Sequence, residues 1–274
     1  MAEKDYRKVA ASKIYRPSSV QRMPKILVYS RNKKGKTKFS TSAGVDTTIV
    51  FDPEYGTSEM RSADPHVWPI VKWSDMDDAI EWLRNVNECP ICKPTHSFGW
   101  ASVDGLTRLS NMALKHVGKL EEERSLTRIP GLLDPRRDYN KAGELLKDML
   151  VRFHNMHDIG VIYTAQERMQ ESTDSEEDSD SGETEVTYVP DLPKSVRGHA
   201  NSLVDVIGRL YVVKVENPKD PGGDPITQRR LWIGDSLKYD TGYRSDFVLP
   251  DYLRNPTVPK LVRLMREGTL KRTR

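Results

Sequence analysis

The stretch KILVYSRNKKGKT, residues 25–37, constrains the fold more than any other part of the chain. Its first five residues are a short apolar run bounded by polar ones, which is typical of a buried parallel strand. Gly35, Lys36 and Thr37 then match the end of the phosphate-loop pattern G-x-x-x-x-G-K-[ST]. In that pattern backbone N–H groups surround a phosphate, the lysine reaches the β and γ oxygens, and the hydroxyl binds Mg²⁺. The stretch therefore predicts a strand followed by a nucleotide-binding loop.

The first position of the pattern departs from it, because Ser30 stands where glycine is expected. Glycine allows a tight turn there, and serine can replace it only if its φ is negative. Lys33 and Lys34 add positive charge to the loop, which either supports phosphate binding or is simply solvated. We therefore expect nucleotide binding, and the serine leaves efficient hydrolysis open. The predicted nucleotide contacts are Ser30, Lys33, Lys34, Gly35, Lys36 and Thr37.

Apolar runs and helical patterns alternate through the first 166 residues. Further strands are predicted in TTIVFD (47–52), GWASVDG (99–105) and GVIYTAQER (160–168), and helices from Ser74 and over 139–157. Strands dominate afterwards, in 203–216 and 229–235, joined by a loop with NPKDPGGDP. This order predicts an α/β fold with a mainly parallel central sheet flanked by helices and an extra strand pair at one edge.

The charge distribution suggests the domain limits. Residues 1–23 are expected to form a basic arm, 24–250 the domain, and 251–274 a basic tail that is either solvated or in contact with a phosphate backbone. Residues 171–185 carry eight carboxylates and no cation, so the rest of the chain holds +11 of charge, and we expect this acidic insertion to be disordered. No apolar run reaches the roughly 20 residues that cross a bilayer. A cytoplasmic location without membrane partners is therefore expected.

A second motif supports the phosphate loop. Asp104 ends the apolar run WASVD, at the strand end where a carboxylate that binds Mg²⁺ directly or through water is expected. An aspartate at this position also has an ordinary turn-forming role. Its combination with Gly35–Thr37 favours a metal site made of Thr37 and Asp104.

Four motifs in order resemble the RecA-like P-loop ATPases of phages, a group of nucleotide-binding AAA-domain proteins of which some assist single-strand annealing recombination. The resemblance covers roughly residues 24–246. The motifs are KILVYSRNKKGKT, IVFDPEYGT, WASVDGLTRL and GVIYTAQER. The chain departs from the group at Ser30, at Tyr55, where a small residue is usual, and in the acidic insertion.

The resemblance implies a RecA-like P-loop NTPase core that binds ATP and Mg²⁺. It implies that Glu54 activates the attacking water, that Gln166 senses the γ-phosphate, and that Lys238 or Arg244 completes a neighbouring subunit's site in a ring or filament. The alternatives are a solvated turn glutamate, an ordinary glutamine at a strand end, and surface cations. Single-stranded DNA and a phage or host single-strand DNA-binding protein are the implied partners, in the cytoplasm of the host cell. The segment after Gln166 touches DNA in the group, whereas here it is acidic and would repel a phosphate backbone.

Other functions remain open at this level. Ser30 and the acidic insertion are also compatible with a catalytically weak or inactive P-loop interaction module, whereas a small-molecule kinase lacks support because no arginine-rich lid pattern is present. Cys89 and Cys92 form C-x-x-C, with His96 four residues on. Zinc binding would need a fourth ligand such as His66, which only folding could supply. We therefore expect unlinked thiols in a loop rather than a zinc or redox site.

Overall fold

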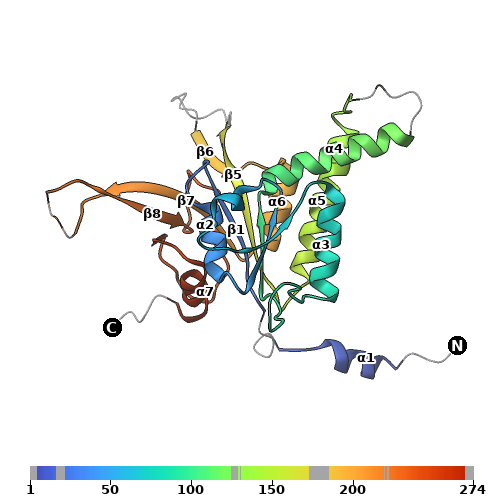
Figure 1. The fold of residues 1–274 in the computed structure, drawn as a ribbon, viewed down its shortest axis with the longest axis horizontal. Helices are drawn as coiled ribbons and strands as arrows, with labels where there is room; N and C mark the ends of the chain where they lie inside the picture. The colour runs from blue at the N-terminus through green and yellow to red at the C-terminus, as the bar shows by residue number, and fades with distance from the viewer. Residues whose placement is uncertain are drawn as a thin grey trace, which may run out of the picture.

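The computed structural model describes residues 5–16, 22–124, 129, 131–172, 185–218, 220 and 222–268. At its centre is a sheet in the order β10-β8-β7-β1-β5-β4-β2-β3, with β6 paired to β5 and β9 to β7 (Figure 1). The mutually parallel strands are β7 (Val206–Val215), β1 (Lys25–Ser30), β5 (Gly160–Ser172), β4 (Trp100–Asp104), β2 (Thr48–Asp52) and β3 (His66–Pro69). The antiparallel additions are β8 (Ile226–Trp232), β10 (Tyr252–Arg254), β6 (Glu185–Pro190) and β9 (Gly242–Tyr243).

Helices cover both faces of the sheet. One face packs against α3 (Trp73–Asn85), α4 (Leu106–Arg124), α5 (Arg137–His154) and α6 (Lys194–Leu203), and the other against α2 (Lys36–Ser40) and α7 (Val258–Glu267) (Figure 1). Short 3₁₀ turns follow α2 (η2, Thr41–Ala43) and β2 (η3, Gly56–Glu59), and the N-terminal helix α1 (Tyr6–Lys13) lies apart from the sheet. Among the described residues, no helix combines the length and apolarity needed to cross a membrane.

Strand β1 shows why its sequence is continuously apolar. Leu27 and Tyr29 point to the core under α3–α6, and Ile26 and Val28 point to the core under α2 and α7. All four are fully buried, because successive side chains of a strand face opposite sides and both sides are covered here. The prediction of a mainly parallel sheet flanked by helices is confirmed, and this arrangement is consistent with the P-loop NTPase core that the resemblance implies.

The expected basic tail differs from the structure. Residues 252–254 form β10, which pairs with β8, and residues 258–267 form α7, so the fold continues past residue 250. The physical reason is apolar burial, because Val258 and Leu261 are fully buried against the sheet. The Val258 N–H also donates to Ser42 Oγ over 2.9 Å, which ties α7 to the turn after the phosphate loop.

Two further expectations need adjustment. In the expected basic arm, residues 6–13 form α1, whose first N–H groups donate to the Asp5 carboxylate. In the acidic insertion, Glu171, Ser172 and Glu185 pair in an antiparallel hairpin of β5 and β6, so disorder is the wrong prediction for these three residues. Residues 173–184, to which the rest of that prediction applies, lie outside the described residues.

Candidate nucleotide-binding site

A cleft of about 910 Å³ opens where β1, β2 and β4 end, beside the middle of β5. The carboxyl ends of parallel strands meet at one edge of a sheet, which is the usual position of ligand sites in α/β folds. Four predicted motifs therefore converge there although they are far apart in sequence. The residues that line this cleft include Lys33, Gly35, Lys36, Thr37, Glu54, Asp104, Gln166 and Arg229.

The loop between β1 and α2 has the backbone of a tight turn. Gly35 has a φ of +98°, which strains any residue with a side chain, and a Cβ there would stand 2.9 Å from Arg229 Nε, so the arginine side chain would also have to shift. Lys33 also lies in the left-handed region, at φ +59°. Ser30 is the buried last residue of β1, pairs with Gln166 and does not have a positive φ. The condition under which serine can replace the first glycine is therefore met.

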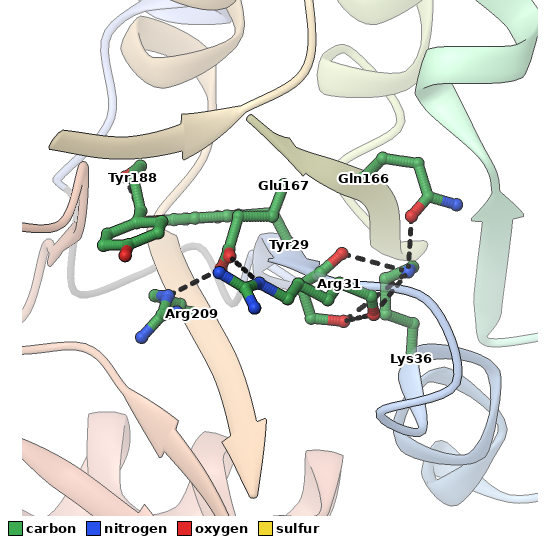
Figure 2. Close-up of polar contacts among 8 residues, drawn as sticks. Tyr29, Arg31, Lys36, Gln166, Glu167, Tyr188 and Arg209 are labelled. Atoms are coloured by element: carbon green, nitrogen blue, oxygen red, sulfur yellow. Dashed lines mark hydrogen bonds and ion pairs between the residues drawn. The ribbon is translucent and has the colours of Figure 1, made fainter. Parts of the chain in front are cut away.

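The Lys36 ammonium is surrounded by neutral oxygens. Its Nζ donates to Ser30 O (3.3 Å), to Arg31 O (3.4 Å) and to Gln166 Oε1 (3.2 Å) (Figure 2). Burial lowers the pKa of Lys36, and the charges of Asp104 and Glu54 oppose that shift. Within the described residues Lys36 makes no ion pair, so a partly desolvated cation lies in the cleft without a counter-ion.

Thr37 and Asp104 form the other half of the loop's chemistry. Thr37 Oγ1 donates to Asp104 Oδ2 over 2.6 Å, and Thr164 Oγ1 donates to Asp104 Oδ1 over 2.7 Å. Burial raises the pKa of Asp104, although both hydroxyl donors favour its carboxylate form. Because β5 lies between β1 and β4, Thr164 reaches Asp104 from the strand that separates it from the loop.

Glu54 is held beside Asp104 by the turn after β2. Asp52 accepts hydrogen bonds from the N–H groups of Glu54 (3.0 Å) and Gly56 (3.2 Å) and from the Thr57 hydroxyl (2.6 Å), which fixes that turn. The Glu54 carboxyl lies against Gly105, where a Cβ would stand 3.0 Å from Glu54 Oε1. Partial burial and the charge of Asp104 raise the pKa of Glu54. A carboxylate with a raised pKa is suited to accept a proton.

A comparison with protein families shows to which family the chain belongs. The family model described as AAA domain matches residues 22–245, which include every predicted site residue. The chain belongs to the AAA domain family. Domains of this family are nucleotide-binding ATPases that typically use Mg²⁺. A comparison with curated proteins finds no match.

The side chains of this AAA domain fit a magnesium nucleotide. A phosphate would supply the negative charge that Lys36 lacks, and the Thr37 hydroxyl and Asp104 carboxylate are the oxygen ligands that Mg²⁺ prefers. Bound Mg²⁺ would neutralise charge on phosphate oxygens. Glu54 lines the same cleft, where its role as the base stays a prediction, and Gln166 links the lysine to β5.

Three predicted site residues do not line the cleft, and the first of them, Ser30, is fully buried at the end of β1. Lys34 is not among the residues that line the cleft. Arg244 lies at the opposite end of the sheet, where its N–H donates to Asp205 O (2.7 Å) and its guanidinium to Ser202 O (2.8 Å). Any contact of Arg244 with a nucleotide would therefore involve a neighbouring subunit, and its role stays a prediction.

Sequence reasoning missed Arg229 and Thr107 of the site. Arg229 belongs to β8 and reaches the cleft beside Gly35. Thr107 Oγ1 accepts from the Gln166 N–H over 3.0 Å and so supports the part of β5 that lines the cleft. No local pattern marks Arg229, since the chain has 43 lysines and arginines and only the strand pairing brings this one to the loop.

Cys89 and Cys92 are free thiols in the loop between α3 and β4, as expected, but they are not isolated from other potential metal ligands. Folding brings Cys89 and Cys92 together with His96 and with His66, which comes from a different segment. The four ligand atoms lie within 4.8 Å of one another.

Proposed function

We propose that the protein is a Mg²⁺-ATP-hydrolysing RecA-like ATPase that acts on single-stranded DNA in phage recombination or replication. In this proposal Lys36 binds the β and γ oxygens, Thr37 and Asp104 hold Mg²⁺, and Glu54 activates the attacking water. Ser30, Lys33 and Gly35 shape the loop. The assignment to phage DNA metabolism rests on the order of the four motifs, and the AAA domain match supports its ATPase part.

A surface of alternating aromatic and arginine side chains supports the DNA part. We call Arg209, Tyr211, Arg230, Trp232 and Tyr252 the aromatic–arginine face. Register pairs Arg209 with Trp232, Tyr211 with Arg230, and Tyr252 with Trp232, so all five project from the same side of β7, β8 and β10. The other side of these strands is buried with α7.

The chemistry of this face is typical of single-strand binding. The Trp232 and Tyr252 rings stack with centroids 6.0 Å apart, and the Arg230 guanidinium lies 4.6 Å from the Tyr252 centroid. All five side chains are partly exposed. Aromatic rings stack with bases of any sequence, and arginines contact the phosphate backbone.

The observation that carries the proposal is the ion-pair link between this face and the phosphate loop. Glu167 follows Gln166 on β5; its carboxylate accepts from Arg31 Nε of the loop (3.2 Å) and from Arg209 Nε of the face (2.6 Å) (Figure 2). Arg209 is held between two rings, with its guanidinium 4.6 Å from the Tyr188 centroid and 4.4 Å from that of Tyr239. A ligand that draws Arg209 outward would therefore disturb the pair that Glu167 shares with the loop.

Assembly is the second part of the proposal. A ring or filament would let Arg244 of one subunit, or Lys238 near the aromatic–arginine face, complete the site of the next. An arginine supplied in this way increases the rate by about 10³ to 10⁵ in related chemistry. A single-strand DNA-binding protein of phage or host is the further partner that this activity implies.

Steady-state hydrolysis of Mg²⁺-ATP, measured with and without single-stranded DNA, tests the proposal. Turnover should rise with DNA, and the logarithm of DNA affinity should fall with that of salt concentration, at a slope near −0.7 per phosphate neutralised. Replacing Tyr252 by alanine removes one stacking platform and should weaken DNA binding by about 1–3 kcal/mol. Arg230→Ala should lower the salt slope.

The matched control is Arg84→Ala, which removes an exposed arginine of α3 far along the sheet from β8. It should leave DNA affinity unchanged. Hydrolysis that DNA does not stimulate, with DNA binding that salt does not weaken, contradicts the DNA part alone. Absence of both hydrolysis and nucleotide binding leaves the inactive interaction module as the function.

A further inference from the structure

Four potential metal ligands converge at the amino ends of the strands, away from the nucleotide cleft. His66 begins the edge strand β3, and Cys89, Cys92 and His96 lie in the loop between α3 and β4. Their ligand atoms lie within 4.8 Å of one another, and His66 Nε2 is 3.0 Å from Cys92 Sγ. We propose that these four side chains form a structural zinc site of the Cys₂His₂ type.

The hydrogen bonding of His96 and the free thiol of Cys89 support this assignment. His96 Nε2 is buried and has no hydrogen-bond partner among the described residues. A buried polar nitrogen without a partner costs about 1–3 kcal/mol, and such atoms are rare in folded proteins. Cys89 is 1% exposed and is not in a disulfide, although Cys92 lies beside it. A metal ion would use the lone pair of His96 and both sulfurs at once.

The other ring nitrogen of His66, Nδ1, makes the hydrogen bond that metal-binding histidines usually make. His66 Nδ1 lies 3.2 Å from the Val45 carbonyl oxygen. A carbonyl only accepts, so Nδ1 carries the proton and Nε2 presents its lone pair toward the cysteines. Metal-binding histidines commonly donate their other N–H to a carbonyl in this way.

The donor set selects the metal. Two thiolates and two imidazoles in a closed set are typical of structural Zn²⁺, whereas a catalytic zinc keeps a position for water. Zn–S and Zn–N bonds of about 2.3 and 2.0 Å in a tetrahedron place ligand atoms roughly 3.3–3.8 Å apart. The cluster needs a contraction of roughly 1.5 Å at most to reach that geometry from its 4.8 Å limit. Binding would release the proton of each thiol that becomes a thiolate.

The surrounding loop is built to hold these ligands. The Cys89 N–H donates to the His96 carbonyl over 2.9 Å, and the Asn87 side chain pairs with both backbone groups of Phe98, over 2.9 and 3.0 Å. The Phe98 ring lies against both imidazoles, with centroids 5.2 Å from His66 and 5.1 Å from His96. The site therefore has an apolar wall, and an ion there would tie β3 to the loop before β4.

The test uses the full-length protein purified without added chelator or affinity metal. Elemental analysis should find about one zinc per chain. Replacement by Co²⁺ should give the strong visible absorption of a tetrahedral site together with thiolate-to-cobalt charge transfer. Removing the metal with a strong chelator should lower the thermal midpoint, while the zinc-loaded protein should protect both thiols from a thiol reagent.

Variants separate this site from adventitious metal. Cys92→Ser and His96→Ala should each lose the stoichiometric zinc, whereas His157→Gln, which removes an exposed histidine outside the cluster, should retain it. Zinc retained equally by Cys92→Ser overturns the proposal. So does wild-type protein that contains no zinc and takes up no Co²⁺, or that has a Cys89–Cys92 disulfide. The wild-type measurements keep the test decisive if the variants fail to fold.

Discussion

Thr37 Oγ1 and Asp104 Oδ2 lie 2.6 Å apart although the residues are 67 positions apart in the chain. Thr37 lies in α2, which follows β1, and Asp104 ends β4. The strand between β1 and β4 is β5, and its Thr164 also donates to Asp104. A hydroxyl and a carboxylate thereby meet in the cleft that Lys36 also lines, and Lys36 makes no ion pair within the described part of the chain. This pairing is the structural basis of the proposed Mg²⁺ site.

Asp104→Asn should raise the Mg²⁺ concentration needed for hydrolysis. The substitution keeps an oxygen for one hydroxyl donor but removes the buried charge that would attract the ion, and losses of this kind weaken metal sites about 10- to 100-fold. Nucleotide affinity without Mg²⁺ should not fall, because a negative charge leaves the cleft. Titration of hydrolysis with MgCl₂ measures the effect, and an unchanged midpoint would contradict the assigned role.

Glu54→Gln should separate binding from chemistry. Loss of a general base lowers the rate by about 10²- to 10⁴-fold, whereas nucleotide affinity should change little because the charged contacts of Lys36 remain. The control is Glu123→Gln, which replaces an exposed carboxylate on α4. Equal rates for wild type and Glu54→Gln, in single-turnover measurements, would exclude Glu54 as the base.

The acid limb of the rate profile should begin at a higher pH than for an ordinary glutamate. Burial and the charge of Asp104 raise the pKa of Glu54 above 4.5, and the base acts only as a carboxylate. As pH falls through that raised pKa, the base gains a proton and hydrolysis declines. The residual activity of Glu54→Gln should lack this decline, and the same acid limb in both proteins would assign it to another group.

Ser30→Gly should leave nucleotide affinity within about threefold of wild type. Ser30 already takes a backbone conformation open to any residue, and its hydroxyl donates within the loop to Arg31 O over 2.8 Å. Glycine in a strand costs about 0.5–1 kcal/mol of stability, so the unfolding midpoint should fall. Ser30→Ala removes the hydroxyl without the conformational freedom of glycine, so it separates the effect of the hydroxyl from that of the backbone. A tenfold gain in turnover for Ser30→Gly would show that the serine impairs the loop.

Lys25 should make the protein more stable as pH rises from about 8 to 10.5. Its Nζ is buried and donates to Met156 O over 2.7 Å, and burial lowers its pKa to about 8 from the ordinary 10.5. Between these values the unfolded chain binds a proton that the folded chain lacks, so the free energy of unfolding increases with pH. Below pH 8 Lys25 is protonated in both the folded and the unfolded chain, so the full cost of burying its charge lowers the free energy of unfolding.

Urea unfolding across this pH window measures the Lys25 effect. Lys25→Met should lack its contribution to the increase, whereas Lys119→Met, an exposed substitution on α4, should keep it. Identical pH dependence in Lys25→Met and wild type would show that another group is responsible.

The phosphate loop was predictable because its chemistry is local, but helix and strand limits depended on packing. Ser74 is a good N-cap by type, yet α3 begins at Trp73, since burial of that indole outweighs the capping preference. Strand β5 continues beyond Gln166 to Ser172, because β6 supplies the hydrogen-bond partners that its polar sequence does not suggest. The local sequence pattern predicts neither the core that buries Trp73 nor the pairing of β6 with β5.

The residues that sequence reasoning misplaced are those brought together by long-range pairing. Arg229 reaches the loop through β8, and α7 is held by burial of Val258 and Leu261 in a segment that reads as a basic tail. The sequence offers His66 as a possible fourth ligand, but only the fold brings it to Cys92. In each case a contact within the sheet or a loop brings together residues whose proximity cannot be predicted from their spacing along the chain.

Binding of Mg²⁺-ATP by calorimetry, with wild type beside Lys36→Ala and Lys34→Ala, tests the central claim most directly. Lys36 has its ammonium in the cleft and Lys34 lies outside its lining, so the two substitutions remove the same charge from neighbouring positions. Lys36→Ala should weaken binding about 10- to 100-fold, as expected for loss of charged hydrogen bonds worth about 1.5–3 kcal/mol. Lys34→Ala should bind as wild type does. Wild-type protein that binds no nucleotide, or equal losses in both variants, would contradict the site.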